Sequence, residues 1–338
     1  MRVSRIGLLA AAAALVGGGI AVPAFASDQR FVAPNNDPAF VQVVDNNLEN
    51  LPTAGLKCPG DWQDLVQYLK RAPLKPDIMT IQQISDQAQL NAYVDKLSNA
   101  LGEKYAGLIA EAKPSNVLHG RCGEPKLYQT NAVIYRTARF ADRGLGHPVW
   151  QAQATKNGKC ANNGQARTKA VKVRLFDKIA NQDVTVASVH WATAQSGGGA
   201  ACSAANAKEI TREMTADGYG GGLLIVGGDF NVSDVDGGFR GWYQNMNGDL
   251  GGAHNYRDPA FAACNGDRNC LRDNWTAGGD KRIDFLFANR PAGGLPTTSA
   301  FHTVTFDEGD AADQAETGSD RGDRDYSDHR AVMTRVHY

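Results

Sequence analysis

The 338-residue sequence has little excess charge of either sign, because 35 Lys and Arg residues nearly balance 36 Asp and Glu residues. A formal net charge of −1 gives no whole-protein attraction to nucleic acid, so an anionic substrate must be held by a local site. The sequence also lacks the patterns GxxxxGK and GxGxxG. Its glycine clusters, QSGGGAAC at 195–202 and DGYGGG at 217–222, therefore predict loops and not phosphate-binding turns.

Long apolar runs are missing after the N-terminus. The first 26 residues hold Arg2, Arg5, an apolar stretch from Ile6 to Val22, and the sequence Ala-Phe-Ala at 24–26. This order predicts a secretory signal peptide at 1–26, followed by a secreted, extracellular mature chain with a formal charge of −3. A membrane anchor is the alternative, which the glycines inside the stretch disfavour.

The sequence has no CxxC pattern, and no cysteine lies near a suitable histidine, which argues against a structural zinc site. Six cysteines are an even number, and in an exported chain they predict disulfides. Many pairings are open. The favoured set joins Cys264 to Cys270, which enclose only NGDRN, together with Cys160 to Cys202 and Cys58 to Cys122.

No Pro-rich or Ser-rich linker and no repeat divides residues 27–338, so one domain is expected. Strands are predicted from apolar runs at 40–44, 77–81, 131–135, 169–176, 184–189, 223–226, 282–288 and 329–336. Amphipathic spacing predicts helices at 61–71, 86–101 and 203–214, the last two capped by Asp86 and Ser203. Because some neighbouring strands have no helix between them, the pattern favours mixed or antiparallel sheets sandwiched by helices.

Two short motifs indicate the chemistry, GGDFN at 227–231 and SDHRAV at 327–332. Each adjoins an apolar run, so its polar side chains lie where a strand meets a loop. Phosphoryl transfer needs a hard cation, a group that activates water, and donors that hold the transition-state charge. Asp229, Asn231, Asp328 and His329 supply these types of group.

Taken together, Asn47 after the first strand, DIMTIQQ at 77–83, SVHWAT, GGDFN, RIDFLF and the terminal SDH resemble the endonuclease/exonuclease/phosphatase superfamily, which includes deoxyribonuclease I and bacterial sphingomyelinases. Six motifs in the family's order span essentially the whole mature chain. The resemblance implies an α+β fold, a four-layer α/β/β/α sandwich with the site at one end. It also implies hydrolysis of phosphodiester bonds.

The resemblance implies a role for each motif residue. Asp229 would orient the attacking water, and Asn231 would hold that water or a phosphate oxygen. His329 would be the general acid or base, with Asp284 fixing its tautomer. His190 would contact the phosphate as a second imidazole.

The resemblance also implies substrate and metal contacts. Asn131 and Arg167 would position phosphate oxygens. The metal, Mg²⁺ or Mn²⁺, would be held by Asn47, Glu49, Gln83 and Asp328. Gln83 stands where the family has its principal metal-binding Glu, so the site loses one anionic ligand and should bind a divalent ion more weakly.

The acidic segment 307–325 is expected to be a mobile surface loop, and a structural Ca²⁺ site there is the alternative.

Three functions remain open: a secreted nuclease, a sphingomyelinase-type phospholipase C acting on a lipid headgroup, and an inactive effector that has lost its metal. A lipid enzyme would expose aromatic side chains, and a nuclease would expose basic ones. The candidates are Trp150, Trp242, Tyr243 and Tyr256 for the first set, and Lys156, Lys159, Arg167, Lys169 and Lys172 for the second. The chain is expected to be a monomer without a transmembrane segment after signal cleavage.

Overall fold

The structure is a computed structural model that describes residues 33–48, 62–114, 129–151, 169–192, 199–235, 238–318 and 325–338. All described residues belong to one compact unit. The predicted signal peptide, Glu49, Cys58, Cys122, Cys160 and Arg167 lie outside the described residues.

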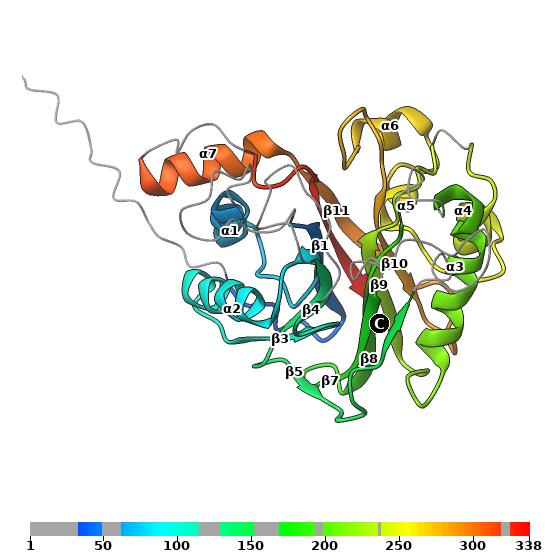
Figure 1. The fold of residues 1–338 in the computed structure, drawn as a ribbon, viewed down its shortest axis with the longest axis horizontal. Helices are drawn as coiled ribbons and strands as arrows, with labels where there is room; N and C mark the ends of the chain where they lie inside the picture. The colour runs from blue at the N-terminus through cyan, green and yellow to red at the C-terminus, as the bar shows by residue number, and fades with distance from the viewer. Residues whose placement is uncertain are drawn as a thin grey trace, which may run out of the picture. The chain divides into compact units, whose positions relative to one another are not determined.

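The strands form two six-stranded sheets, which face each other in the sandwich (Figure 1). The first sheet has the order β11-β12-β1-β2-β4-β3, and the second has the order β10-β9-β8-β7-β5 with β6 paired to β7. The bounds in the first sheet are β1 Phe40–Asn47, β2 Ile78–Ile84, β3 Tyr105–Ile109, β4 Thr130–Arg136, β11 Thr298–Val304 and β12 Ala331–His337. Those in the second are β5 Phe140–Asp142, β6 Val149–Gln151, β7 Lys169–Asp177, β8 Gln182–His190, β9 Leu223–Asp229 and β10 Asp284–Asn289.

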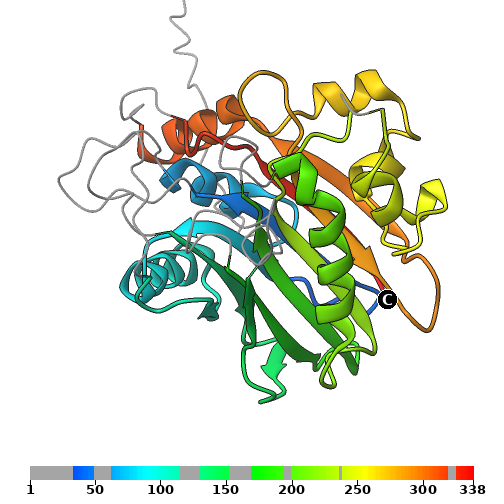
Figure 2. The same cartoon turned by 45° about the vertical axis from the view of Figure 1, so that its right-hand side comes forward.

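Helices cover the outer faces of both sheets (Figures 1 and 2). On the first sheet lie α1 Trp62–Arg71, α2 Gln87–Leu101 and α7 Phe306–Thr317. On the side of the second lie α3 Gly199–Thr215, α4 Trp242–Met246, α5 Pro259–Ala263 and α6 Arg268–Asp273, with the short 3₁₀ helix η6 Gly248–Leu250. The predicted four-layer α/β/β/α sandwich is therefore confirmed. No helix in the described ranges is long and apolar enough to cross a membrane.

The eight predicted strands are all present, and so are the three predicted helices. Asp86 caps α2 as expected, since its carboxylate accepts a hydrogen bond from the Gln89 backbone N–H at 2.8 Å. The cap assigned to Ser203 is wrong, because α3 begins at Gly199 and Ser203 lies inside the helix. The acidic segment is also not simply a loop. Its first part forms α7, capped by Thr305, and the Lys70–Glu316 ion pair ties α7 to α1.

The core between the sheets is apolar along most of its length and polar at one end. Along β1, Val41 and Val43 face this core, and the next two residues with the same orientation are Asp45 and Asn47. All four side chains are buried. The change from valine to polar residues along one strand face marks the end of the sandwich where the candidate site lies.

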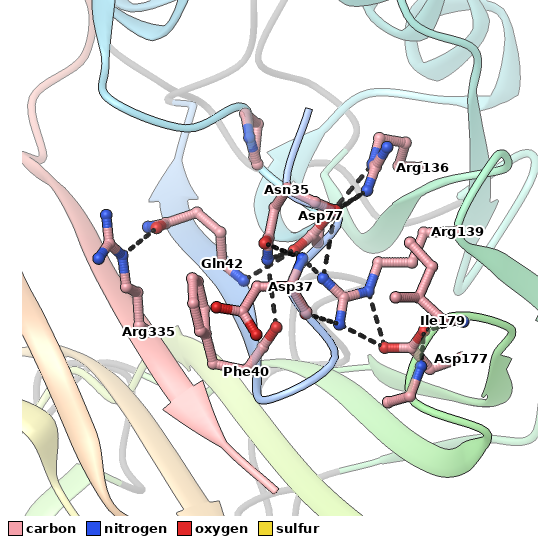
Figure 3. Close-up of polar contacts among 12 residues, drawn as sticks. Asn35, Asp37, Phe40, Gln42, Asp77, Arg136, Arg139, Asp177, Ile179 and Arg335 are labelled. Carbon is pink, nitrogen blue, oxygen red and sulfur yellow. Dashed lines mark hydrogen bonds and ion pairs between the residues drawn. The ribbon is translucent and has the colours of Figure 1, made fainter. Parts of the chain in front are cut away.

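The opposite end is closed by a buried network of charges (Figure 3). Arg139 reaches Asp77 at 3.1 Å and Asp177 at 2.7 Å, and Arg136 reaches Asp77 at 3.0 Å. Asn35 also donates to Asp77. Because the nine residues of β8 run from Gln182, beside Asp177, to His190 at the candidate site, about 26 Å separate the two ends.

Candidate active site

Strand pairing brings the predicted catalytic residues together. His190 ends β8, Asp229 ends β9 and Asp284 begins β10, and the sheet register places His190 opposite Asp229 and Asp229 opposite Asp284. Gly227 lets the facing sheet come close, because a Cβ there would lie 2.0 Å from the hydroxyl of Thr80. These residues therefore form one cluster in the interior of the sandwich, at the ends of its central strands.

Asp229 is the centre of this cluster. Its Oδ2 lies 3.2 Å from His190 Nε2 and 3.9 Å from His329 Nε2, and it accepts a hydrogen bond from Asn47 Nδ2 at 3.1 Å. Burial alone would raise the pKa of Asp229. The two imidazoles outweigh burial and lower this pKa to about 2, so the carboxylate is ionised at neutral pH.

His329 and Asp284 form a buried pair, with His329 Nδ1 lying 2.8 Å from Asp284 Oδ2. Burial disfavours the imidazolium, but the carboxylates of Asp284 and Asp229 outweigh it and raise the pKa of His329 well above its usual range. Burial raises the pKa of Asp284 to about 6, against the attraction of His329. This orientation leaves Nε2 of His329 facing Asp229, as the predicted acid–base role requires.

Asn231 lies on the loop after β9 in the left-handed region, with φ of +56°. Its backbone N–H donates to Asp229 Oδ1 at 2.8 Å, and its side-chain amide donates to the carbonyl of Trp191 at 2.8 Å. Between them Phe230 is fully buried, stacked on Trp242 and edge-on to Trp191. The aromatic packing therefore anchors the loop from inside while Asp229 and Asn231 stay at the cluster.

Sequence reasoning missed Asp45, which lies beneath the cluster. Its Oδ1 accepts hydrogen bonds from Thr80 at 2.6 Å and Gln82 at 2.9 Å, and its Oδ2 has no hydrogen-bond partner in the described part of the chain. Burial and the charge of Asp284 raise the pKa of Asp45 well above its usual value. The sequence did carry a signal: Asp45 is an acid at the β1 position where the alternation that turns Val41 and Val43 toward the core predicts another apolar residue.

The predicted metal ligands come from neighbouring strands. Asn47 ends β1, Gln83 lies near the end of β2, and Asp328 precedes β12, which pairs with β1. Gln83 has φ of +58° at an irregularity in the β2–β4 pairing, and its Oε1 accepts from Gln129 Nε2 at 2.9 Å. All three ligands offer oxygen, which suits a hard cation, and Asp328 is the one anion among them. The described residues thus fit a weakly held divalent ion.

A second group of side chains could hold a cation. Asp229, Asp284 and His329 have ligand atoms within 4.8 Å of one another, and among the described residues no other trio of acidic, His or Cys groups meets this distance. The described part of the acidic segment 307–325 therefore offers no such cluster for the alternative Ca²⁺ site. Its Glu308 instead pairs with His302 at 2.6 Å.

The structure also describes the predicted phosphate contact Asn131 and three of the six cysteines. Asn131 is buried near the start of β4, and its side chain donates to the carbonyl of Lys169 at 2.7 Å. Cys264 and Cys270 form the predicted disulfide. Cys202 is also disulfide-bonded, and its predicted partner Cys160 lies outside the described residues.

The sequence left open which set of rim residues is exposed, and Lys156, Lys159 and Arg167 of the basic set lie outside the described residues. The four aromatic candidates are all buried, because they pack in the core between the second sheet and its helices: Trp150, Trp242, Tyr243 and Tyr256. Of the basic candidates, Lys172 is fully buried and pairs with Glu213, and Lys169 pairs with Glu111 at 2.7 Å. Within the described residues, the exposed large apolar side chains are Leu145 and Val149.

Comparison with known proteins agrees with this geometry. Residues 47–329 match the endonuclease/exonuclease/phosphatase family, and the chain belongs to this family. It is a family of hydrolases that generally act on phosphodiester bonds and commonly use divalent metals. No curated protein matches the sequence.

Solved structures resemble the fold at low sequence identity. The human nocturnin catalytic domain is 13% identical with a TM-score of 0.57, and the match covers 88% of this chain and 93% of that one. TDP2 of D. rerio in complex with a single-strand DNA product is 12% identical with a TM-score of 0.53, covering 88% and 98%. A family protein from Beutenbergia cavernae is 16% identical with a TM-score of 0.54, covering 88% and 72%. Identities this low support the shared fold alone.

Proposed function

We propose that this protein is a secreted, divalent-metal-dependent phosphodiesterase, and that its substrate is nucleic acid. The single observation that carries the proposal is the cluster of Asp229, His190, Asn47 and the His329–Asp284 pair at one end of the sandwich. It combines an ionised carboxylate, two imidazoles and an amide, the groups that in-line attack of water on a phosphodiester requires.

The protonation states assign the roles. Asp229, with a pKa of about 2, accepts the hydrogen bond of the attacking water and directs its oxygen at phosphorus. As the water oxygen bonds to phosphorus, the water gives a proton to the Asp229 carboxylate, and the bond from phosphorus to the ester oxygen breaks. His329, whose pKa is raised, donates its Nε2 proton to that leaving oxygen. His190 and Asn231 donate hydrogen bonds to phosphate oxygens.

Asn47, Gln83 and Asp328 would hold the divalent ion, with Glu49 as a further ligand. A bound cation would neutralise charge on the phosphate oxygens. The ligand set with Gln83 carries one negative charge fewer than the family's set with Glu, so millimolar rather than micromolar metal should be needed.

Burial of the four aromatic candidates counts against a membrane-binding rim, whereas three of the five basic candidates, Lys156, Lys159 and Arg167, lie outside the described residues. TDP2, which shares the fold, was solved with a single-strand DNA product. Export is supported by the N-terminal sequence and by the disulfide-bonded Cys202, Cys264 and Cys270, which suit an oxidising compartment.

The test is cleavage of plasmid DNA, structured RNA and sphingomyelin by the mature protein with Mg²⁺, Mn²⁺ or Ca²⁺. The Asp229→Ala/His329→Ala variant should be inactive. The matched control is Asp142→Ala/His147→Ala, which removes another His–Asp pair, one with a 2.7 Å contact on the surface. It should retain full activity.

Turnover of sphingomyelin alone would move the protein to the phospholipase C class. The second candidate function, an inactive effector, rests on Gln83. It requires no turnover of any substrate and no binding of Mg²⁺ by calorimetry.

A further inference from the structure

Arg282 is a buried cation beside the candidate site that the proposed chemistry does not use. It is 2% exposed, and its guanidinium bridges two carboxylates, Asp234 Oδ2 and Asp258 Oδ2, each at 2.5 Å. Tyr243 donates its hydroxyl to the same Asp258 oxygen at 2.6 Å, and the guanidinium lies over the ring of Phe285 at 4.4 Å. Such a network is costly to bury and remains stable only when every partner is present.

The bridge joins the two segments that carry the predicted catalytic carboxylates. Arg282 lies two residues before Asp284, and Asp234 lies on the loop that leaves β9 after Asp229. The backbone also links these segments, because β9 and β10 pair with Asp229 opposite Asp284, and the N–H of Phe230 extends this pairing by donating to the carbonyl of Ile283 at 2.8 Å. The guanidinium therefore fixes the β9 loop relative to the start of β10.

The β9 loop needs such an anchor because it contains a non-glycine residue in the left-handed region, Asn231. A conformation of this kind persists only where its surroundings enforce it. Upstream, the loop is held by the burial of Phe230. Downstream, it is held by Arg282 at Asp234 and by Arg268, which donates to the carbonyl of Val235 at 2.7 Å.

We propose that Arg282 is a positioning residue, which sets the place of Asn231 and Asp229 relative to the Asp284–His329 pair. The role depends on the shape of the guanidinium. Its planar, forked donors can bond two carboxylates at once, whereas the single ammonium of lysine cannot reproduce that geometry. The proposal rests on the phosphodiesterase activity proposed above.

The test compares Arg282→Lys with Arg139→Lys. Arg139 is the matched control, because it is equally buried and also bridges two aspartates, Asp77 and Asp177, at the far end of the sandwich. Both variants should lose a similar amount of stability in urea unfolding. Arg282→Lys should also lower kcat about 10- to 100-fold with KM changed less than about threefold, because a small misplacement of reacting groups costs this much. Arg139→Lys should leave kcat unchanged.

A second measurement does not need turnover. The Nδ1–H resonance of His329, hydrogen-bonded to Asp284, should shift in the NMR spectrum of Arg282→Lys and stay in place in Arg139→Lys. If the wild-type protein cleaves no substrate, the proposed function fails, while this resonance still decides whether Arg282 positions the pair.

If Arg282→Lys does not fold, Asp258→Asn takes its place, since it removes one charge at nearly constant volume. Equal kcat in both arginine variants, together with an unmoved His329 resonance, overturns the proposal. A kcat loss in Arg139→Lys as large as that in Arg282→Lys overturns it as well, because the effect would then follow from stability.

Discussion

The two ends of the sandwich are both polar and buried, yet they satisfy their charges differently. At the far end, both oxygens of Asp77 and of Asp177 accept hydrogen bonds, and Arg139 joins the two carboxylates (Figure 3). At the catalytic end, one oxygen of the buried Asp45 has no hydrogen-bond partner among the described residues. A saturated network stabilises a fold, whereas unsatisfied groups cost stability and are kept where chemistry or a ligand uses them.

The largest expected effect is a loss of catalysis, and it follows from removing the charge of Asp229 at the catalytic end. Asp229→Asn keeps the shape of the side chain but removes the charge that faces His190 and His329. We expect kcat/KM to fall about 10³- to 10⁴-fold with the fold intact, because acid–base catalysis of this kind contributes on that scale. The control is Asp177→Asn, the same change at the far end, which should lower the melting temperature and leave kcat/KM unchanged. Comparable activity losses in the two variants would contradict the assignment.

The next effect is on stability and concerns the far end. Asp77→Ala removes the carboxylate shared by Arg136 and Arg139 and leaves both guanidiniums buried. Breaking a buried ion pair in this way costs about 3 kcal/mol or more, measured by urea unfolding. Asp183→Ala, which removes the partner of Arg143 and Arg174 nearer the surface, should cost about 1 kcal/mol or less. A similar loss in both variants would show that the far end is not a specially stabilised network.

The sequence predicts the residues of the catalytic end better than the charge network at the far end. The motifs placed Asp229 and His190 after apolar strands and Asp284 in a third strand, and the register of β8, β9 and β10 then brought them together. Apolar runs and helical spacing were sufficient for the strands and helices because burial imposes periods that a sequence displays. Shorter or less regular strands such as β3 and β5 lacked that pattern.

The side-chain contacts of the buried polar residues could not be predicted. Asp45, Arg136 and Arg139 pair with residues far away in the chain, and such partners have no spacing that a sequence reveals. The sequence left open whether the aromatic candidates for a lipid-binding rim are exposed, for a related reason. The sequence alone does not show whether an aromatic residue on a predicted helix or strand faces solvent or, like Trp242, packs in the core.

A smaller effect concerns the affinity of the catalytic end for its metal. Gln83→Glu restores a carboxylate beside Asn47 and Asp328, and Gln129 can still donate to it. We expect Mg²⁺ to bind about tenfold more tightly by calorimetry, since an added anionic ligand raises affinity for a hard cation. Gln182→Glu makes the same charge change at the exposed, far end of β8 and should leave Mg²⁺ affinity unchanged. Unaltered binding in Gln83→Glu would mean that the ion is held by other ligands.

The smallest expected effect concerns Asp45 and the pH dependence of stability. Its pKa is raised in the folded protein, so its contribution to stability is fully present below the unfolded pKa near 4 and is lost as the pH rises through the folded pKa. Asp45→Asn removes this titration while its amide oxygen can still accept from Thr80 and Gln82. The variant should therefore gain on the order of 1 kcal/mol relative to wild type at pH 8, and little or nothing at pH 4, in urea unfolding.

The matched control for Asp45 is Asp77→Asn at the far end. There the lost charge leaves the paired arginines without their counter-ion, so the variant should be less stable than wild type at pH 8. Opposite signs for the same substitution at the two ends would show that the far end is stabilised by its charges and the catalytic end is not. A loss of stability in Asp45→Asn at pH 8 would instead mean that the Asp45 carboxylate is ionised and compensated by a cation bound in the site.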